Sequence, residues 1–108
     1  MSLTLRDAQH LCWKNFRKIN DTLDREMQDK WMPYTMIADL LEETGKVATA
    51  VKGLEKFKPS EEPNPKEMLT TELSDVLYTI FILAEHYGIE LEEAFMQTVN
   101  DRIISMLR

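Results

Sequence analysis

The chain has 108 residues, of which 44% are hydrophobic and 30% are charged, and its 19 acidic and 13 basic side chains give a net charge of -6. A chain of this length forms one small domain with a single modest core, so we predict one domain over residues 1–108. The negative charge argues against a nucleic-acid polymer as a partner, whereas a small phosphate compound bridged by a divalent cation is compatible with it.

The sequence also limits the compartment. Cys12 is the only cysteine, which excludes a disulfide framework and a cysteine-rich zinc site and fits a reducing environment. The N-terminus lacks the basic and apolar segments of a secretion signal, and no apolar run reaches the ~18 residues of a membrane span. We therefore expect a cytoplasmic protein with no membrane partner.

Two helices are predicted in the first half of the chain. Helical spacing of apolar residues predicts the first from about Thr4 into the twenties. Its apolar positions are Leu5, Ala8, Leu11, Cys12, Phe16, Ile19 and Leu23. Met32 and Pro33 mark the start of the second helix, because proline suits the first helical turn. The apolar stripe of this helix comprises Ile37, Leu40, Leu41, Thr44, Val47, Ala48, Val51 and Leu54.

Two more helices are predicted in the second half. A loop rich in proline and charge, KPSEEPNPKE at residues 58–67, precedes a third helix from about Lys66 to Tyr87. Gly88 follows as a C-terminal cap, and a fourth helix runs from Leu91 to about Leu107. No segment shows the alternation typical of a strand. The expected fold is therefore all-α, a four-helix bundle.

The third helix contains the segment VLYTIFILA at residues 76–84, which is apolar on nearly every side. A helix of this kind has to be buried on several sides, and a four-helix domain of this size has few helices with which to cover it. We therefore predict that oligomerisation completes the bundle, as a homodimer or homotetramer. The alternative is that the first helix folds over the third within one subunit.

Acidic positions recur one helical turn apart on the second and third helices. Positions i and i+3 share a helix face, which pairs Glu43 with Lys46 and Glu72 with Asp75. If the helices pack antiparallel, the carboxylates converge, and they would repel one another unless a cation lay among them. Oxygen donors without His or Cys favour Mg²⁺ or Mn²⁺. Solvated helix faces are the alternative explanation of the same acids.

The order of these acids resembles the signature of the MazG-like all-α NTP pyrophosphohydrolase family. That signature is EExxE, usually EExGE, on one helix and ExxD before an apolar run on the next. The matching residues here are Glu42-Glu43-Thr44-Gly45-Lys46 and Glu72-Leu73-Ser74-Asp75. The segment TIFILAEHYGIELEEAF is similar to the family's apolar helix, glycine turn and last helix. The resemblance therefore covers roughly residues 31–108.

This resemblance implies hydrolysis of a nucleoside triphosphate to the monophosphate and pyrophosphate, dependent on Mg²⁺ or Mn²⁺. It implies Glu43, Glu72 and Asp75 as metal ligands, with Glu42 as a neighbouring acid that can orient water. Such ions neutralise phosphate charge, lower the pKa of a bound water and align its attack on phosphorus.

Two further residues are candidate substrate contacts. Asn100, in TVNDR, stands where family members often have an asparagine followed by basic residues, and it is a candidate to meet phosphate. Trp31 lies next to the motif helix and is a candidate to stack on the base, with an anchor of the turn between helices as the equal alternative. His10 and His86 lack the spacing of a metal pair and are expected to be surface or hydrogen-bonded residues.

Lys46 is the departure from the family pattern, because it places a cation where the signature has an acid. Three explanations compete. Lys46 contacts substrate phosphate directly, or the enzyme works with fewer metals at a reduced rate, or the site is inactive. The last explanation leaves a non-catalytic nucleotide-binding or regulatory relative, and a helical oligomeric interaction module is a further alternative.

Overall fold

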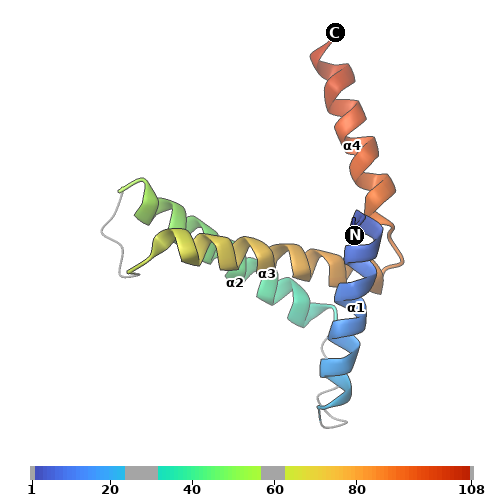
Figure 1. Ribbon diagram of the computed structural model, residues 1–108, viewed down its shortest axis with the longest axis horizontal. Coiled ribbons are helices and arrows are strands. Elements are labelled where there is room, and N and C mark those ends of the chain that lie inside the picture. The colour runs from blue at the N-terminus through green and yellow to red at the C-terminus, as the bar shows by residue number, and fades with distance from the viewer. Residues whose placement is uncertain (1, 24–31, 57–62, 108) are drawn as a thin grey trace. The chain divides into compact units, whose positions relative to one another are not determined.

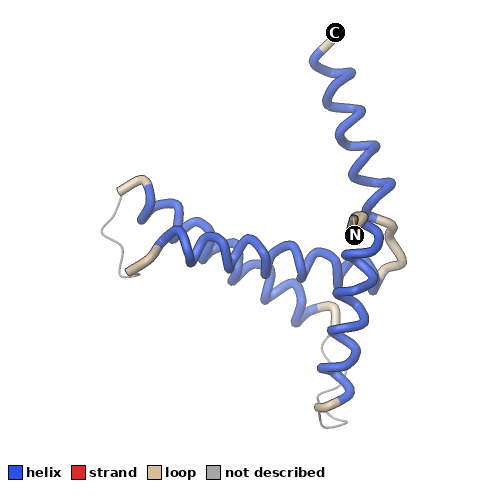
Figure 2. Tube along the Cα trace, viewed as in Figure 1, coloured by secondary structure: helices blue, strands red, loops and turns tan. Residues whose placement is uncertain are grey.

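The computed structural model describes residues 2–23, 32–56 and 63–107, and the regular structure in these ranges is entirely helical (Figures 1 and 2). The helices are α1 (Leu5–Asp21), α2 (Tyr34–Leu54), α3 (Pro65–His86) and α4 (Leu91–Met106). Where the sequence predicted a helix end, the observed end lies within two residues of it. The all-α prediction is therefore confirmed. Trp31 and residues 58–62 of the predicted loop lie outside the described residues.

Local hydrogen bonds explain where α1 and α3 begin. The Thr4 hydroxyl accepts a bond of 3.0 Å from the Asp7 N–H, and the Asp7 carboxylate accepts one of 3.3 Å from the Thr4 N–H. Asn64 and Glu67 form a similar pair, in which the Glu67 N–H donates to Asn64 Oδ1 at 3.1 Å and Asn64 Nδ2 donates to the Glu67 carboxylate at 3.2 Å. Both pairs satisfy backbone groups that a helix start otherwise leaves unpaired.

Gly88 ends α3 as the sequence predicted. Its φ of 67° lies in the left-handed region, which costs glycine little because it has no Cβ. The turn is closed by a 2.8 Å bond from the Ile89 N–H to the Ala84 carbonyl, the pattern of a glycine-terminated helix. The direction of the chain into α4 is therefore set by a local motif.

The chain divides into two compact units, and the boundary between them along the sequence falls within α3. We call Asp29–Ile80 the hairpin unit and Met1–Gln28 with Phe81–Arg108 the terminal unit. In the hairpin unit, α2 and the first part of α3 run antiparallel and side by side (Figure 1). In the described ranges, no helix is both long and apolar enough to span a membrane.

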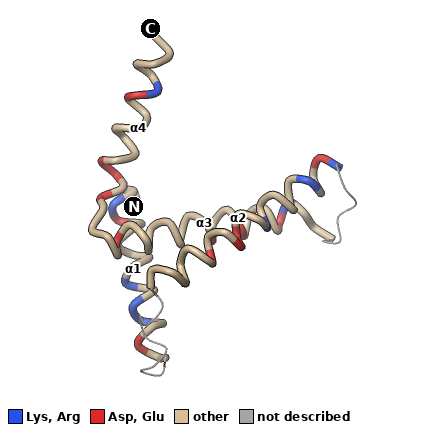
Figure 3. Tube along the Cα trace, turned by 180° about the vertical axis from the view of Figure 1, so that it is seen from behind, with Lys and Arg blue, Asp and Glu red and all other residues tan. Residues whose placement is uncertain are grey.

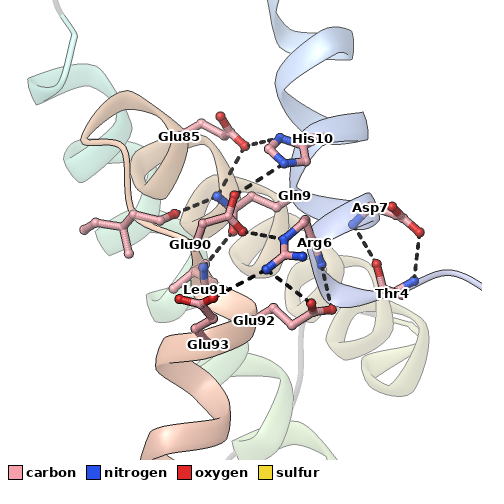
Figure 4. Close-up of polar contacts among 11 residues, drawn as sticks. Thr4, Arg6, Asp7, Gln9, His10, Glu85, Glu90, Leu91, Glu92 and Glu93 are labelled. Atoms are coloured by element: carbon pink, nitrogen blue, oxygen red, sulfur yellow. Dashed lines mark hydrogen bonds and ion pairs between the residues drawn. The ribbon is translucent and has the colours of Figure 1, made fainter.

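A buried glutamine organises the terminal unit (Figure 4). Gln9 on α1 is 1% exposed, and its Nε2 donates to the Ile89 carbonyl at 2.7 Å and to Glu85 at 3.3 Å. Its Oε1 accepts a 3.1 Å bond from the Leu91 N–H, the first residue of α4. Gln9 thus caps the start of α4 from another helix and fixes α1 against the α3–α4 turn.

Charged residues surround this glutamine at the surface. Arg6 pairs with Glu90 at 2.9 Å, and its guanidinium pKa is raised by this hydrogen bond first and then by the charges of Glu90, Glu92 and Glu93. His10 contacts Glu85 through Nδ1 at 2.6 Å. His10 was expected to be a surface or hydrogen-bonded residue, and its side chain is half exposed.

Candidate functional site

A hydrogen bond between the two helices of the hairpin unit sets the register of the site. The Thr79 hydroxyl on α3 donates to Glu43 Oε2 on α2 at 3.0 Å. Because the helices are antiparallel, moving two turns along each from this bond brings Ala50 to the level of Glu72. Ala50 is fully buried and Glu72 is only 9% exposed. Helical geometry therefore predicts that the small side chain of Ala50 lies opposite Glu72.

Glu72 is a buried carboxylate with an unmet bonding requirement. Its Oε2 is shielded from solvent and finds no hydrogen-bond donor among the described residues. A buried carboxylate oxygen without a donor or cation costs free energy, so natural proteins rarely leave one in this state. This oxygen is therefore a candidate ligand for a cation that the residues of the hairpin unit would hold.

Glu43 occupies a similarly unfavourable environment. Its pKa is raised, first because burial disfavours the charged form and then because Asp75, Asp39 and Glu72 repel it, while the Thr79 hydrogen bond acts in the opposite direction. A cation near these carboxylates would oppose both the burial and the repulsion. The electrostatics of this group therefore fit a positively charged ligand.

Lys46 lies on the same side of the hairpin unit and supplies a positive charge from within the chain. Its Nζ is 3.3 Å from Glu42 Oε1, and both side chains are largely exposed. The Glu42 hydrogen bond, and then the charges of Glu72 and Glu42, raise the Lys46 pKa. Lys46 thus partly offsets the negative charge of the acids at the position where the family signature has another acid.

The hairpin unit collects five of the predicted site residues, and Figure 3 marks acidic positions on both of its helices. They are Glu42, Glu43, Lys46, Glu72 and Asp75. Asn100 is exposed on α4 and belongs to the terminal unit. Trp31 lies outside the described residues.

The donor chemistry of this group fits a hard divalent cation, since all its donors are carboxylate oxygens. The described residues contain no group of three His, Cys, Asp or Glu side chains already close enough to hold a metal ion. The register of α2 against α3 explains why these acids are not close together. Glu43 and Glu72 are separated by roughly two helical turns along the hairpin, about 10 Å. The acids would have to turn toward one another to share a cation.

Sequence analysis missed Thr79, which contacts Glu43 directly. Within VLYTIFILA a threonine is a polar interruption of an apolar run, and that interruption is the pattern that could have identified it. It also missed Asp39, one turn before Glu43 on α2, whose charge acts on Glu43. Asp39 is not part of the family signature, so the resemblance did not point to it.

Comparisons with known proteins identify the family of the chain. The model of the MazG nucleotide pyrophosphohydrolase domain matches residues 32–104. "Uncharacterized protein YvdC" of Bacillus subtilis (strain 168) is 36% identical over 67 residues, which is 56% of this chain and 63% of that protein. This chain therefore spans less than two thirds of the length of that relative. No solved structure gives a significant match.

The matched range is well over half of the chain and contains the whole of α2 and α3 with both acid motifs. It also contains the Thr79–Glu43 bond and the buried Glu72, so the features described above lie inside the domain that the family shares. The chain belongs to the MazG nucleotide pyrophosphohydrolase domain family.

Proposed function

We propose that this protein hydrolyses a nucleoside triphosphate to the monophosphate and pyrophosphate in a reaction that requires Mg²⁺ or Mn²⁺. The observation that supports it most strongly is the buried, unpartnered Oε2 of Glu72 on the face shared with Glu43 and Lys46. Membership of the family supports the reaction class, because its members generally depend on a divalent metal. In this proposal the substrate is a nucleotide, and it binds at a carboxylate site that requires a cation.

In this proposal Glu43, Glu72 and Asp75 hold the cation, which supplies charge neutralisation for the triphosphate and an acidified water. Glu42 lies at the exposed edge of the site, where its carboxylate can accept a proton from water or orient it. Asn100 and Trp31 remain proposed contacts for phosphate and base. The site needs positioned acids and little else, because phosphoryl transfer depends mainly on alignment and charge.

For Lys46 we favour a lost metal ligand over a new phosphate contact. Its ammonium is already paired with Glu42 at the solvent edge, and a residue in that position can remain there while the other acids hold a cation. The second candidate function is a non-catalytic nucleotide-binding protein. The replacement of an acid by Lys46 in the signature favours it.

We further propose that the protein is a homodimer or homotetramer. On α3, Leu73, Leu77 and Ile80 recur at helical spacing and remain 52%, 49% and 37% exposed. On α2, Ile37, Leu41 and Val51 form a second exposed apolar stripe. Helical geometry puts these stripes on one side of the hairpin unit and Lys46 with Asp75 on the other, so a second copy can cover the apolar side and leave the acids accessible.

The test is a panel of canonical and modified nucleoside triphosphates with Mg²⁺ or Mn²⁺, assayed for pyrophosphate and monophosphate beside an active family member. We expect equimolar release of both products from at least one substrate. Thermal stabilisation by nucleotide and metal without product would instead establish the non-catalytic binding protein, since binding to the native state raises stability. If the protein shows neither product release nor thermal stabilisation, the result would support the remaining alternative, a helical interaction module.

A further inference from the structure

The Thr79 hydroxyl differs from several other helical threonines in what it contacts. Thr44, Thr49, Thr70 and Thr98 each donate to the carbonyl four residues earlier in their own helix, at 2.8–3.2 Å. That bond is the usual way for a helical threonine to satisfy its hydroxyl. Thr79 instead donates across the hairpin unit to the Glu43 carboxylate at 3.0 Å. The helix itself would satisfy Thr79 locally, so the contact with Glu43 reflects the arrangement of the site.

The environment of this bond strengthens it. Thr79 is 4% exposed, in a segment whose neighbours along the helix are mostly apolar. A hydrogen bond from a hydroxyl to a charged carboxylate is stronger than one between neutral groups, and low solvent access strengthens it further. The bond therefore restrains the rotamer of Glu43, a half-buried acid that would otherwise turn toward solvent to escape repulsion by its acidic neighbours.

The bond also divides the two oxygens of Glu43 between two tasks. Thr79 donates to Oε2, which leaves the lone pairs of Oε1 available to a cation. Carboxylates that bind metals are commonly held by a hydrogen bond of this kind from a neighbouring group, and removing that partner weakens metal binding by about 10–100-fold. Thr79 meets the requirements for this role in position, burial and direction of donation.

We propose that Thr79 is a positioning residue that holds the Glu43 carboxylate in the orientation that binds the divalent cation. This inference rests on the proposed function, because it takes Glu43 as a ligand of the metal. In this role Thr79 acts through Glu43 and not directly on the substrate. The consequence is that the hydroxyl of Thr79, and not its methyl group, determines the affinity of the site for the cation.

The experiment measures the Kd of the purified protein for Mn²⁺ alone, from the electron paramagnetic resonance signal of free Mn²⁺. Thr79→Val keeps the shape of the side chain and removes the hydroxyl, and we expect its Kd to rise about tenfold. Thr79→Ser keeps the hydroxyl and should stay within about twofold of the unmodified protein. Thr70→Val is the matched control, since it removes a hydroxyl that bonds only its own helix and should leave Kd unchanged.

Melting curves without metal establish that each variant is folded, and Thr79→Ala decides the question if the valine variant does not fold. An unchanged Kd in Thr79→Val or Thr79→Ala overturns the inference and leaves the proposed function intact. An equal loss in Thr70→Val also overturns it, because the effect would then not be specific to Glu43. Absence of Mn²⁺ binding by the unmodified protein overturns the inference together with the metal-dependent function.

Discussion

At the scale of single residues, the site is defined by carboxylates that are only partly accessible to water. Glu72 is buried, and helical geometry predicts the small side chain of Ala50 opposite it. Glu43 is held by Thr79 among acidic neighbours. Negative charge placed in this way destabilises the fold unless something positive lies nearby. Lys46 supplies part of that charge from within the chain, and the proposed cation supplies the rest.

The first prediction concerns Lys46→Glu. This substitution removes a cation from the neighbourhood of Glu72 and adds an oxygen donor to a group of hard ligands, so Mn²⁺ binding should tighten about tenfold and turnover should rise. Lys52→Glu makes the same charge change on the same helix and serves as the control. A fall in turnover with Mn²⁺ affinity unchanged would show that Lys46 contacts the substrate.

The second prediction uses the raised pKa of Glu43. The folded protein binds this proton more tightly than the unfolded chain does. The stability that the folded state gains by binding this proton is therefore fully present below the ordinary glutamate pKa of about 4.3. This stability is lost as the pH rises through the higher pKa of Glu43 in the folded state. Above that value the ionised carboxylate opposes folding.

Glu43→Gln should accordingly have a higher melting temperature than the unmodified protein at pH 7 in buffer without divalent cations. The difference should shrink as the pH is lowered and vanish below about pH 4, where Glu43 is protonated in both states. Glu93→Gln, at a side chain that is 80% exposed, should show little change across the same range. A melting temperature lower than that of the unmodified protein at pH 7 would contradict the burial and repulsion described for Glu43.

At the scale of helices, the sequence predicted what local interactions determine. The ends of α1 and α3 follow from Thr4 with Asp7 and from Gly88, and both sets of residues act within a few positions of one another. Apolar periodicity was less informative about burial in α1, where the apolar Leu11 is 59% exposed and the polar Gln9 is buried. The burial of Gln9 depends on partners about 80 positions away, which no local pattern records.

The candidate site shows the same division. Helical spacing places Glu72 and Asp75 on one helix, but the choice of these acids over the chain's many others came from the family resemblance. The polar interruption of an apolar run marks Thr79 as unusual, but neither source indicated its partner, because the hydroxyl of an isolated helix would bond its own backbone. Its partner became apparent only from the register of α2 against α3.

The third prediction tests the connection between α1 and the α3–α4 turn. Gln9→Ala deprives the Ile89 carbonyl and the Leu91 N–H of their partner at a buried position, and should lower the free energy of unfolding by about 2–4 kcal/mol. Urea denaturation measures this change. Gln97→Ala removes an exposed glutamine that bonds Asp101 and should cost less than about 0.5 kcal/mol. Equal effects of the two substitutions would show that Gln9 has no special role.

At the scale of the whole molecule, the described residues form only a small apolar core. The buried apolar side chains of the described residues are Ala50, Phe81, Ile82 and Ala84, whereas many large apolar side chains of all four helices are exposed. A small domain with so little buried apolar surface is only marginally stable alone. In the proposed homo-oligomer, contacts with further copies of the chain would bury these exposed apolar side chains.

The fourth prediction follows from the apolar stripe on α3. Leu77→Glu introduces a charge at a position that is half exposed in one chain and buried in the proposed assembly, so it should convert the oligomer to monomer. Light scattering coupled to size exclusion measures the mass. Ser74→Glu adds the same charge on α3 away from the centre of the stripe and should leave the mass unchanged. A monomeric unmodified protein would contradict the assembly.

The most direct test of the proposed function compares pyrophosphate release by the unmodified protein and by Glu72→Gln. The substitution keeps the size of the buried side chain and removes the charge that the cation requires. With Mn²⁺ and the best substrate of the nucleotide panel, the unmodified protein should release pyrophosphate, and Glu72→Gln should be slower by about 100-fold or more while retaining its fold. Equal rates from the two proteins, or no pyrophosphate from the unmodified protein across the whole panel, would contradict a metal-dependent pyrophosphohydrolase built on the acids of α2 and α3.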